Sequence, residues 1–162
     1  MHRPLKRHKA LVPLSRDHHF GLLLVWKIRQ GLSFKVNLLR IRDYLVYYVD
    51  QHISPHFLLE EAAVFPFLEA KDPLRQQAEA QHEAIRSTFE GIRGGEPEAM
   101  SQSLEEFAGS LEAHIRFEER SLFEHMQAVL SPEKLTKLGE KIAESHRLSD
   151  EIWEDEFWKK DN

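Results

Sequence analysis

A short pattern of histidine and glutamate occurs twice in this 162-residue chain and limits what the chain can fold into. The copies span residues 56–65 and 114–123, and both read H-x-x-x-E-E-x-x-(aliphatic)-F. Residues four apart lie one turn apart on one face of an α-helix, so each copy directs an imidazole and a carboxylate to the same point. Both copies fall on the apolar face of a predicted helix, where an unpaired polar side chain is costly. The repeat therefore predicts two helices that face each other across a shared polar site.

The rest of the chain favours an all-α fold, because glycine and proline cluster at breaks and no long β-branched alternation occurs. Helices are predicted over residues 15–31, 36–65, 72–94 and 97–129. Ser15 is expected to cap the first helix and Asp72 the third, and Pro55 to kink the second just before His56. Four helices with short connections predict an antiparallel up-down four-helix bundle over residues 11–130. Residues 131–162 are expected to form a C-terminal helical extension that packs on the bundle through its aromatic end.

Each of the four predicted helices carries polar side chains inside its apolar stripe. His82 fills the one vacant position in the stripe of residues 72–94, and His18 is predicted to be buried because Arg16 and Lys27 point away from it. One such histidine alone is more simply explained as a hydrogen-bonded core residue. Six polar residues in four inward stripes instead indicate a metal site, with the ligands His18, His56, Glu60, His82, His114 and Glu118. Imidazole and carboxylate without thiolate suit iron or manganese, and six ligands suit a dinuclear centre with bridging carboxylates.

The remaining polar residues near these stripes receive supporting roles. Glu61 and Glu119 are expected to hydrogen-bond ligand imidazoles or neighbouring helices. His52 is either a ligand or, as we prefer, a residue that packs beside the site. His125 and His146 are assigned to the surface or the tail, and His2, His8 and His19 are assigned structural or solvated roles. A dry wall around the site is predicted from Leu22, Trp26, Phe65, Phe89 and Phe123.

Composition narrows the classes of partner and compartment. A net charge of −5 gives no reason to expect nucleic acid or an anionic membrane as a partner. The absence of cysteine excludes thiolate zinc sites, iron–sulfur clusters and thiol catalysis. The apolar run from Phe20 to Trp26 is too short to span a bilayer, and no signal-peptide pattern precedes it. A cytoplasmic location is therefore expected.

At these residues the chain resembles the hemerythrin-like, or HHE cation-binding, family. The resemblance covers residues 11–130 and is carried by residues 14–19, by His56 through Pro66, by the lone His82 and by His114 through Phe123. It implies a four-helix bundle around a non-haem di-iron centre, that is, two iron ions with an oxo or hydroxo bridge. Such a centre is implied to bind dioxygen or a related small ligand such as nitric oxide.

One departure from this pattern affects the expected chemistry. Oxygen-carrying hemerythrins have a second histidine four residues after the first in the third helix, where this chain has Arg86, and a longer His-to-Asp spacing in the fourth helix. Two six-coordinate irons offer about 12 positions, and the four imidazoles, two bridging carboxylates and one oxygen bridge leave about two open. A five-histidine site leaves about one. The more open site favours sensing, redox chemistry or metal lability over protected oxygenation.

Several functions remain open at this point. The first is a protein that binds or senses dioxygen, nitric oxide or iron, and the second is a di-iron redox enzyme that turns over peroxide, oxygen or nitric oxide. The third is a metal-stabilised module whose tail meets a protein partner. Iron-centre repair relatives share the four-histidine, two-glutamate set but typically add a cysteine-bearing segment, which makes repair a weaker alternative. We favour binding or sensing, because only Tyr44, Tyr47 and Tyr48 suggest acid–base groups for an enzyme.

Overall fold

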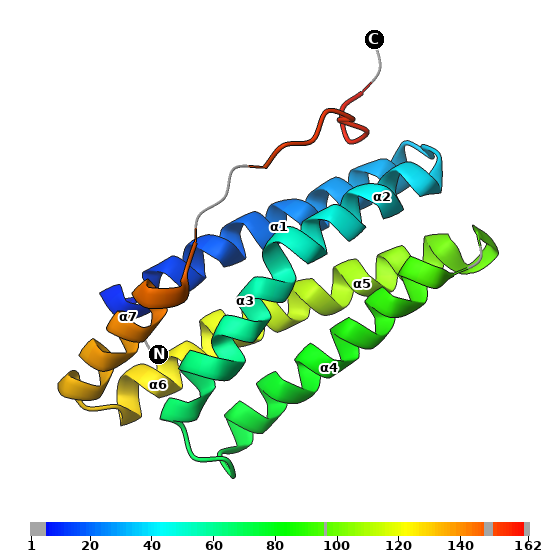
Figure 1. The fold of residues 1–162 in the computed structure, drawn as a ribbon. Helices are drawn as coiled ribbons and strands as arrows, with labels where there is room; N and C mark the ends of the chain where they lie inside the picture. Colours follow the sequence, from blue (N-terminus) through cyan, green and yellow to red (C-terminus); the bar gives the residue numbers. More distant parts are fainter. Residues whose placement is uncertain (1–5, 96, 148–150, 161–162) are drawn as a thin grey trace.

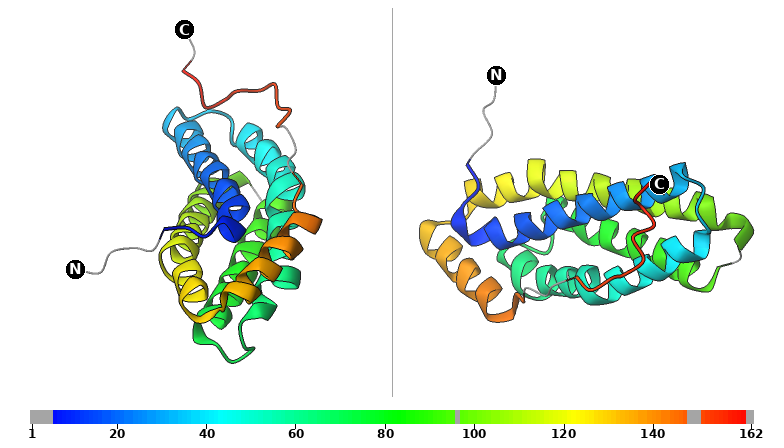
Figure 2. Two further views of the ribbon diagram at one scale, coloured as in Figure 1. Left: turned by 90° about the vertical axis from the view of Figure 1, so that its left-hand side faces the viewer. Right: turned by 90° about the horizontal axis from the view of Figure 1, so that it is seen from above.

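A computed structural model describes residues 6–95, 97–147 and 151–160 of the chain, and this part is helical throughout its regular structure, with no strand. The expected all-α class is confirmed. The helices are α1 (Val12–Ser33), α2 (Leu38–Tyr48), α3 (Ser54–Leu59), α4 (Pro73–Gly94), α5 (Pro97–Phe117), α6 (Phe123–Val129) and α7 (Pro132–Ser145). Figure 1 shows α1 beside α2 and α4 beside α5, each pair joined by a short turn, and α5 packs against both α1 and α4. The long helices run along a common direction, which the view from above makes plain (Figure 2).

Short non-α segments interrupt or extend these helices. Two are 3-10 turns, η1 (Lys9–Leu11) before α1 and η4 (Phe65–Phe67) before the loop to α4. Three are π-helical turns, η2 (Val49–Ile53), η3 (Glu60–Val64) and η5 (Glu118–Leu122). The turn η2 lies between α2 and α3 just ahead of Pro55, and the chain changes direction there (Figure 1). The expected irregularity before His56 is therefore present, as a π turn that the helix runs through.

Helices α4 and α7 each begin directly after a residue whose side chain caps the helix N-terminus. Asp72 accepts hydrogen bonds from the backbone N–H groups of Leu74 and Arg75, and Pro73 occupies the first position of α4. The hydroxyl of Ser131 accepts from the backbone of Lys134 at the start of α7. The cap predicted at Asp72 is confirmed.

The predicted start of the first helix at Ser15 is wrong. Helix α1 begins at Val12, and the Ser15 hydroxyl donates to the Glu119 carboxylate, with oxygen–oxygen distances of 2.9 and 3.0 Å. Helix α1 also continues past Gly31, which is buried against the C-terminal segment. A Cβ at Gly31 would lie 2.8 Å from two ring carbons of Phe157, so this glycine permits a close approach.

Two apolar clusters make up the core and leave a polar layer between them. The first cluster includes Leu24, Ile28, Tyr44, Phe107 and Leu111. The second includes Leu14, Val64, Phe65, Leu122 and Phe123. On each long helix the predicted ligand falls between residues of these two clusters. The core therefore brackets the candidate site on both sides.

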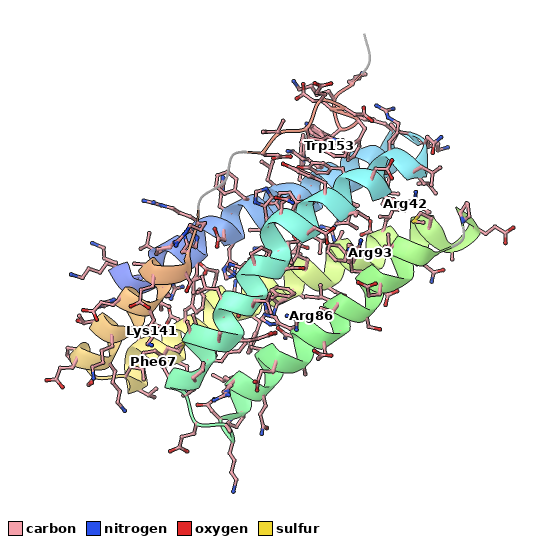
Figure 3. The ribbon with its side chains drawn as sticks, in the orientation of Figure 1. Arg42, Phe67, Arg86, Arg93, Lys141 and Trp153 are labelled. Atoms are coloured by element: carbon pink, nitrogen blue, oxygen red, sulfur yellow. The ribbon has the colours of Figure 1, made fainter. Side chains whose placement is uncertain are left out.

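The C-terminal part packs on the bundle in two pieces. Helix α7 buries Leu135, Leu138 and Ile142 in the second cluster. Residues 151–160 form no helix, and within them Phe157 and Trp158 are buried in the first cluster. This second piece runs beside α1 and α2, where Trp153 is labelled in Figure 3. Within the described residues, none of the helices combines the length and apolar character needed to cross a bilayer.

Candidate metal centre

The six predicted ligands are all buried and lie together in the polar layer. Glu60, His82 and Glu118 are fully buried, and His18, His56 and His114 are no more than 9% exposed. They come from α1, α3, η3, α4, α5 and η5, far apart in sequence. Their ligand atoms form two groups, His18–His56–Glu60–Glu118 and Glu60–His82–His114–Glu118, in each of which the atoms lie within 4.8 Å of one another. Both groups contain both carboxylates, which is the arrangement expected of a dinuclear centre with carboxylate bridges.

Every imidazole of this set turns Nε2 toward a carboxylate. His18 Nε2 lies 2.9 Å from Glu118 Oε1, and His114 Nε2 lies 3.6 Å from Glu118 Oε2. His56 Nε2 and His82 Nε2 both lie 3.2 Å from Glu60 Oε1. Each glutamate therefore lies between one histidine of the first ligand group and one histidine of the second.

The other ring nitrogen, Nδ1, of each imidazole has a polar partner outside the cluster. Nδ1 of His18 lies 2.9 Å from a Glu119 oxygen, and that of His82 lies 2.6 Å from a Glu61 oxygen. These two contacts confirm the supporting role predicted for Glu61 and Glu119. For the remaining two rings, the partners of Nδ1 are Asp17 for His56 at 2.8 Å and Gln81 for His114 at 2.6 Å. Each partner offers an oxygen that accepts a hydrogen bond from Nδ1–H, and in that tautomer the lone pair of Nε2 faces inward, as metal ligation requires.

The atoms that face inward are also the ones without hydrogen bonds. Within the described part of the chain, the Nε2 atoms of the four histidines and both oxygens of Glu60 and Glu118 have no hydrogen-bond partner, since their close approaches lack hydrogen-bond geometry. Buried polar atoms normally find partners, and leaving this many unsatisfied costs several kcal/mol. Cations placed among four lone pairs and two carboxylates remove that cost. The residues present therefore fit a pair of metal ions.

Electrostatics support the same conclusion. Burial and the neighbouring Glu60 carboxylate raise the pKa of Glu118 well above its usual range. Burial lowers the pKa of His114 to about 3, so this imidazole is neutral and its lone pair is available. A metal-free centre would thus keep a proton on one carboxyl group, which metal binding displaces.

The two π turns begin at the two candidate carboxylate ligands. In η3 the backbone N–H of Phe65 donates to the carbonyl of Glu60, and in η5 that of Phe123 donates to Glu118, both across five residues. Five residues apart is about 140° around an α-helix, whereas a π turn returns to the same face. The turns thereby bring both phenylalanines to the centre, where the ring centroids lie 5.3 Å apart for Phe65–His82 and 5.5 Å for Phe123–His18. The predicted dry wall is correct for these two residues.

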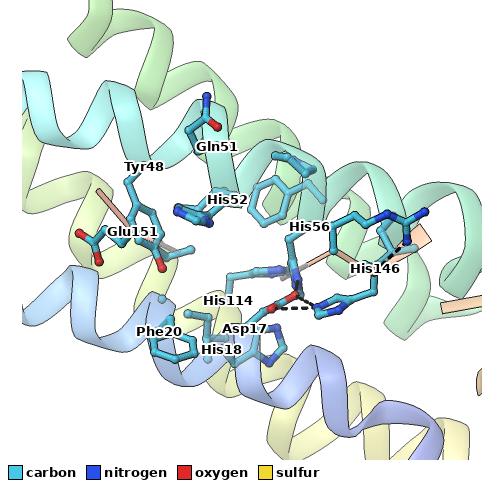
Figure 4. Close-up of a pocket in the computed structure, with 18 of the residues that line it drawn as sticks. Asp17, His18, Phe20, Tyr48, Gln51, His52, His56, His114, His146 and Glu151 are labelled. Carbon is cyan, nitrogen blue, oxygen red and sulfur yellow. Dashed lines mark hydrogen bonds and ion pairs between the residues drawn. The ribbon is translucent and has the colours of Figure 1, made fainter. Parts of the chain in front are cut away.

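A cavity of about 530 Å³ opens beside the centre (Figure 4). Its lining includes the three ligand candidates His18, His56 and His114. Across the cavity from them lie Tyr48 and His52, whose rings are 4.7 Å apart. His52 belongs to neither ligand group and thus has the neighbouring position that we preferred for it.

Two cavity residues were missed or misplaced by sequence reasoning. Asp17 was not singled out, although its carboxylate contacts His56, and it also lies 3.0 Å from Nε2 of His146 (Figure 4). His146, assigned to the surface or the tail, lies in the tail at the end of α7, but its side chain is 12% exposed and lines the cavity, so the surface alternative is wrong. No spacing rule links residues 17, 56 and 146, since the end of α7 meets α1 only in the folded chain. Gln81 was missed for the same reason, because it serves a histidine on another helix.

Three further placements correct or complete the sequence assignments. Trp26, predicted in the dry wall, is 47% exposed. Lys27, predicted to face solvent, is buried with its Nζ 3.0 Å from the Tyr44 hydroxyl and 4.1 Å from the Trp158 ring centre. His125 lies 2.7 Å from the carboxylate of Asp72, and His8 caps η1 through Ala10. His19 is exposed as expected, and His2 lies outside the described residues.

The sequence of the chain was compared with models of protein families. Residues 8–128 match the model of the hemerythrin HHE cation-binding domain. The chain belongs to the hemerythrin HHE family. The matched range contains all six ligand candidates and ends before α7. No curated protein and no solved structure matches the chain in the corresponding comparisons.

Within this hemerythrin domain, Arg86 does not take up the position of a fifth histidine ligand. Its guanidinium donates to both Glu61 oxygens, at 2.7 and 2.9 Å, and lies 5.5 Å above the Phe57 ring. Figure 3 shows Arg86 between α3 and α4. Arg86 therefore holds the carboxylate that orients His82 and supplies no atom to the cluster.

Proposed function

We propose that this hemerythrin domain is an up-down four-helix bundle that holds two iron ions. In this proposal His18 and His56 bind one ion, His82 and His114 bind the other, and Glu60 and Glu118 bridge them. The supporting observation is the pair of four-residue groups that share both carboxylates, with inward nitrogens and oxygens that lack hydrogen bonds. Nitrogen and oxygen donors without thiolate suit iron, and the bound ions would supply one-electron redox chemistry.

We further propose that the centre binds or senses a small diatomic ligand, dioxygen or nitric oxide. Four imidazoles, two bridging carboxylates and one oxygen bridge leave about two of roughly 12 octahedral positions open. The surrounding residues exclude water from part of this space, since Phe57 stacks on His82 with a centroid distance of 3.8 Å and Phe123 stacks on His18. The chain therefore offers open coordination positions next to apolar rings.

Metal analysis of protein produced with ample iron and purified without oxygen tests this function. We expect about two irons per chain, on the ligand count above. The optical spectrum should gain near-ultraviolet bands on exposure to dioxygen and lose them on chelation. One zinc and no iron under these conditions would contradict the dinuclear assignment.

The cavity gives a specific reason to consider a second function, a di-iron redox enzyme. A volume of about 530 Å³ is larger than a diatomic ligand needs, and Tyr48 and His52 place a hydroxyl and an imidazole across it from the ligand candidates. A redox enzyme turns over many equivalents of peroxide or nitric oxide, whereas a binding protein takes up about one ligand per centre. Stopped-flow measurement of consumption per centre separates these two functions.

A further inference from the structure

We propose that the two metal positions have unequal affinity and that the protein therefore passes through a one-metal state. The His18–His56 position holds its ion tightly, and the His82–His114 position exchanges its ion. This inference rests on the proposed function, because it presumes that both positions bind metal. The observation that carries it is the difference in charge between the groups that hold Nδ1 of the four imidazoles.

Both imidazoles of the His18–His56 position are held by carboxylates. Glu119 lies 2.9 Å from Nδ1 of His18, and Asp17 lies 2.8 Å from Nδ1 of His56. The Glu119 carboxylate has a guanidinium nitrogen of Arg7 at 3.9 Å, and Arg7 donates instead to the Glu119 backbone carbonyl at 2.6 Å. Asp17 also lies 3.0 Å from Nε2 of His146. Among the described residues, neither carboxylate accepts a hydrogen bond from a guanidinium.

The partners at the His82–His114 position carry less negative charge. Glu61 holds His82, but both of its oxygens also accept from the Arg86 guanidinium at 2.7 and 2.9 Å, which cancels its formal charge. The partner of His114 is the amide oxygen of Gln81, at 2.6 Å, which is neutral. Around the Nδ1 atoms the first position therefore has two carboxylates to which no guanidinium of the described residues donates. The second position has one carboxylate paired with Arg86 and one neutral amide.

This difference changes the strength of the metal ligands. An imidazole that donates to a carboxylate is a stronger electron donor than one that donates to an amide, and removal of such a partner typically weakens metal binding about 10–100-fold. The added negative charge also attracts a cation through the buried, poorly screened surroundings. The His18–His56 position should therefore fill first and empty last, with the two dissociation constants at least about tenfold apart.

An exchangeable second ion gives the centre a graded response to iron supply. At low free iron only the His18–His56 position is filled, and the bridging glutamates then have one ion between them. At higher free iron the second position fills and the dinuclear centre is complete. The number of ions bound at the centre therefore depends on the concentration of free iron, so the site responds to iron supply in addition to holding two redox-active ions.

Isothermal titration calorimetry of the metal-free protein with ferrous iron, carried out without oxygen, tests the order of filling. We expect two binding events with the tighter at least about tenfold stronger. In His82→Ala the weaker event should disappear and the tighter remain, and in His18→Ala the tighter event should disappear. Two equal events, or loss of the tighter event in His82→Ala, would overturn the inference.

A charge substitution tests the cause of the inequality. Gln81→Glu gives His114 a carboxylate partner and should tighten the weaker event about tenfold without changing the tighter one. Gln77→Glu makes the same change of charge on the exposed side of α4 and should change neither. An unchanged weaker event in Gln81→Glu would contradict the role of the Nδ1 partners.

The same titration separates this inference from the proposed function. No ferrous iron bound by the parent protein would refute the proposed function. Two ions bound with equal affinity would leave the di-iron centre intact and refute only the inequality. Should Gln81→Glu not fold, the rate of iron release from the parent to a ferrous chelator decides. Two phases of equal amplitude support unequal positions, and a single phase opposes them.

Discussion

The imidazoles of the centre differ from the other histidines by what their two ring nitrogens contact. Each candidate ligand has Nδ1 against an oxygen of the surrounding helices and Nε2 among the buried carboxylates. His125 has instead a carboxylate at Nε2, where Asp72 lies at 2.7 Å beside the start of α4. A histidine with its Nε2 committed to a structural hydrogen bond offers no ligand lone pair at that atom. The direction of the ring therefore distinguishes the two kinds.

This difference gives a matched pair of substitutions. His82→Ala should lose one metal ion or most of the affinity for it, because water replaces a buried imidazole ligand at the centre. His125→Ala should keep metal content and spectrum and cost about 1 kcal/mol of unfolding free energy through the hydrogen bond to Asp72. Elemental analysis and urea unfolding measure the two effects. Loss of metal in His125→Ala, with His82→Ala still loaded, would show that α4 gives the site no ligand.

At the scale of single residues, the sequence singled out the candidate ligands but not all of the residues that orient them. His82 stood out because it interrupts an apolar stripe, and Glu61 because it follows a candidate ligand in the repeat. Asp17 and Gln81 carry no such mark, since each orients a ring on another helix. Local periodicity predicts which face a residue occupies, whereas a contact between helices depends on how they are packed.

At the scale of helices, the π turns are the feature that α-helical periodicity could not predict. Both repeats were expected to be regular α-helix, and both contain a π turn that begins at the glutamate, η3 at Glu60 and η5 at Glu118. The two copies share a phenylalanine five residues after that glutamate, which is the spacing that a π turn brings to one face. An α-helix would turn Phe65 and Phe123 about 140° away from the ligands, and the extra residue of each π turn brings them back.

A substitution tests the role of the ring that the π turn brings to the centre. Phe65→Ala removes a fully buried side chain and should cost about 3–5 kcal/mol of unfolding free energy and speed iron release. Guanidinium unfolding and a chelator assay give the two readouts. Ala62→Ser, at an exposed position in the same turn, serves as control. A Phe65→Ala variant that releases iron no faster than this control would show that the ring does not shield the centre.

At the scale of the whole molecule, the polar layer is held between two apolar clusters. Leu24, Ile28 and Phe107 lie in one cluster, and Val64 and Met126 lie in the other. The apolar packing that stabilises the fold is therefore separate from the candidate metal centre. The C-terminal piece adds to the first cluster through Phe157 and Trp158. The sequence predicted that the tail packs on the bundle, but the buried Lys27 under Trp158 is visible only in the assembled chain.

Metal removal should therefore weaken the fold without abolishing it. At free iron of 100 times the dissociation constant, binding contributes about 2.7 kcal/mol to the stability of the folded state. For a chain of this size that corresponds to a fall of about 5–10 °C in melting temperature on chelation. Circular dichroism at low temperature should keep nearly all of its helical signal, because both apolar clusters remain buried.

The two carboxylates that we propose as bridging ligands supply the control for this measurement. In metal-free protein Glu60 and Glu118 face each other in a buried layer, and the pKa of Glu118 is raised well above its usual range by burial and by Glu60. Glu118→Gln removes that repulsion together with a bridging ligand. We expect the variant to bind metal poorly, to show no shift of melting temperature with chelator, and to be more stable than the metal-free parent. A parent protein whose melting temperature is unchanged by chelation, and equal to that of Glu118→Gln, would mean that the six residues are a polar core without metal.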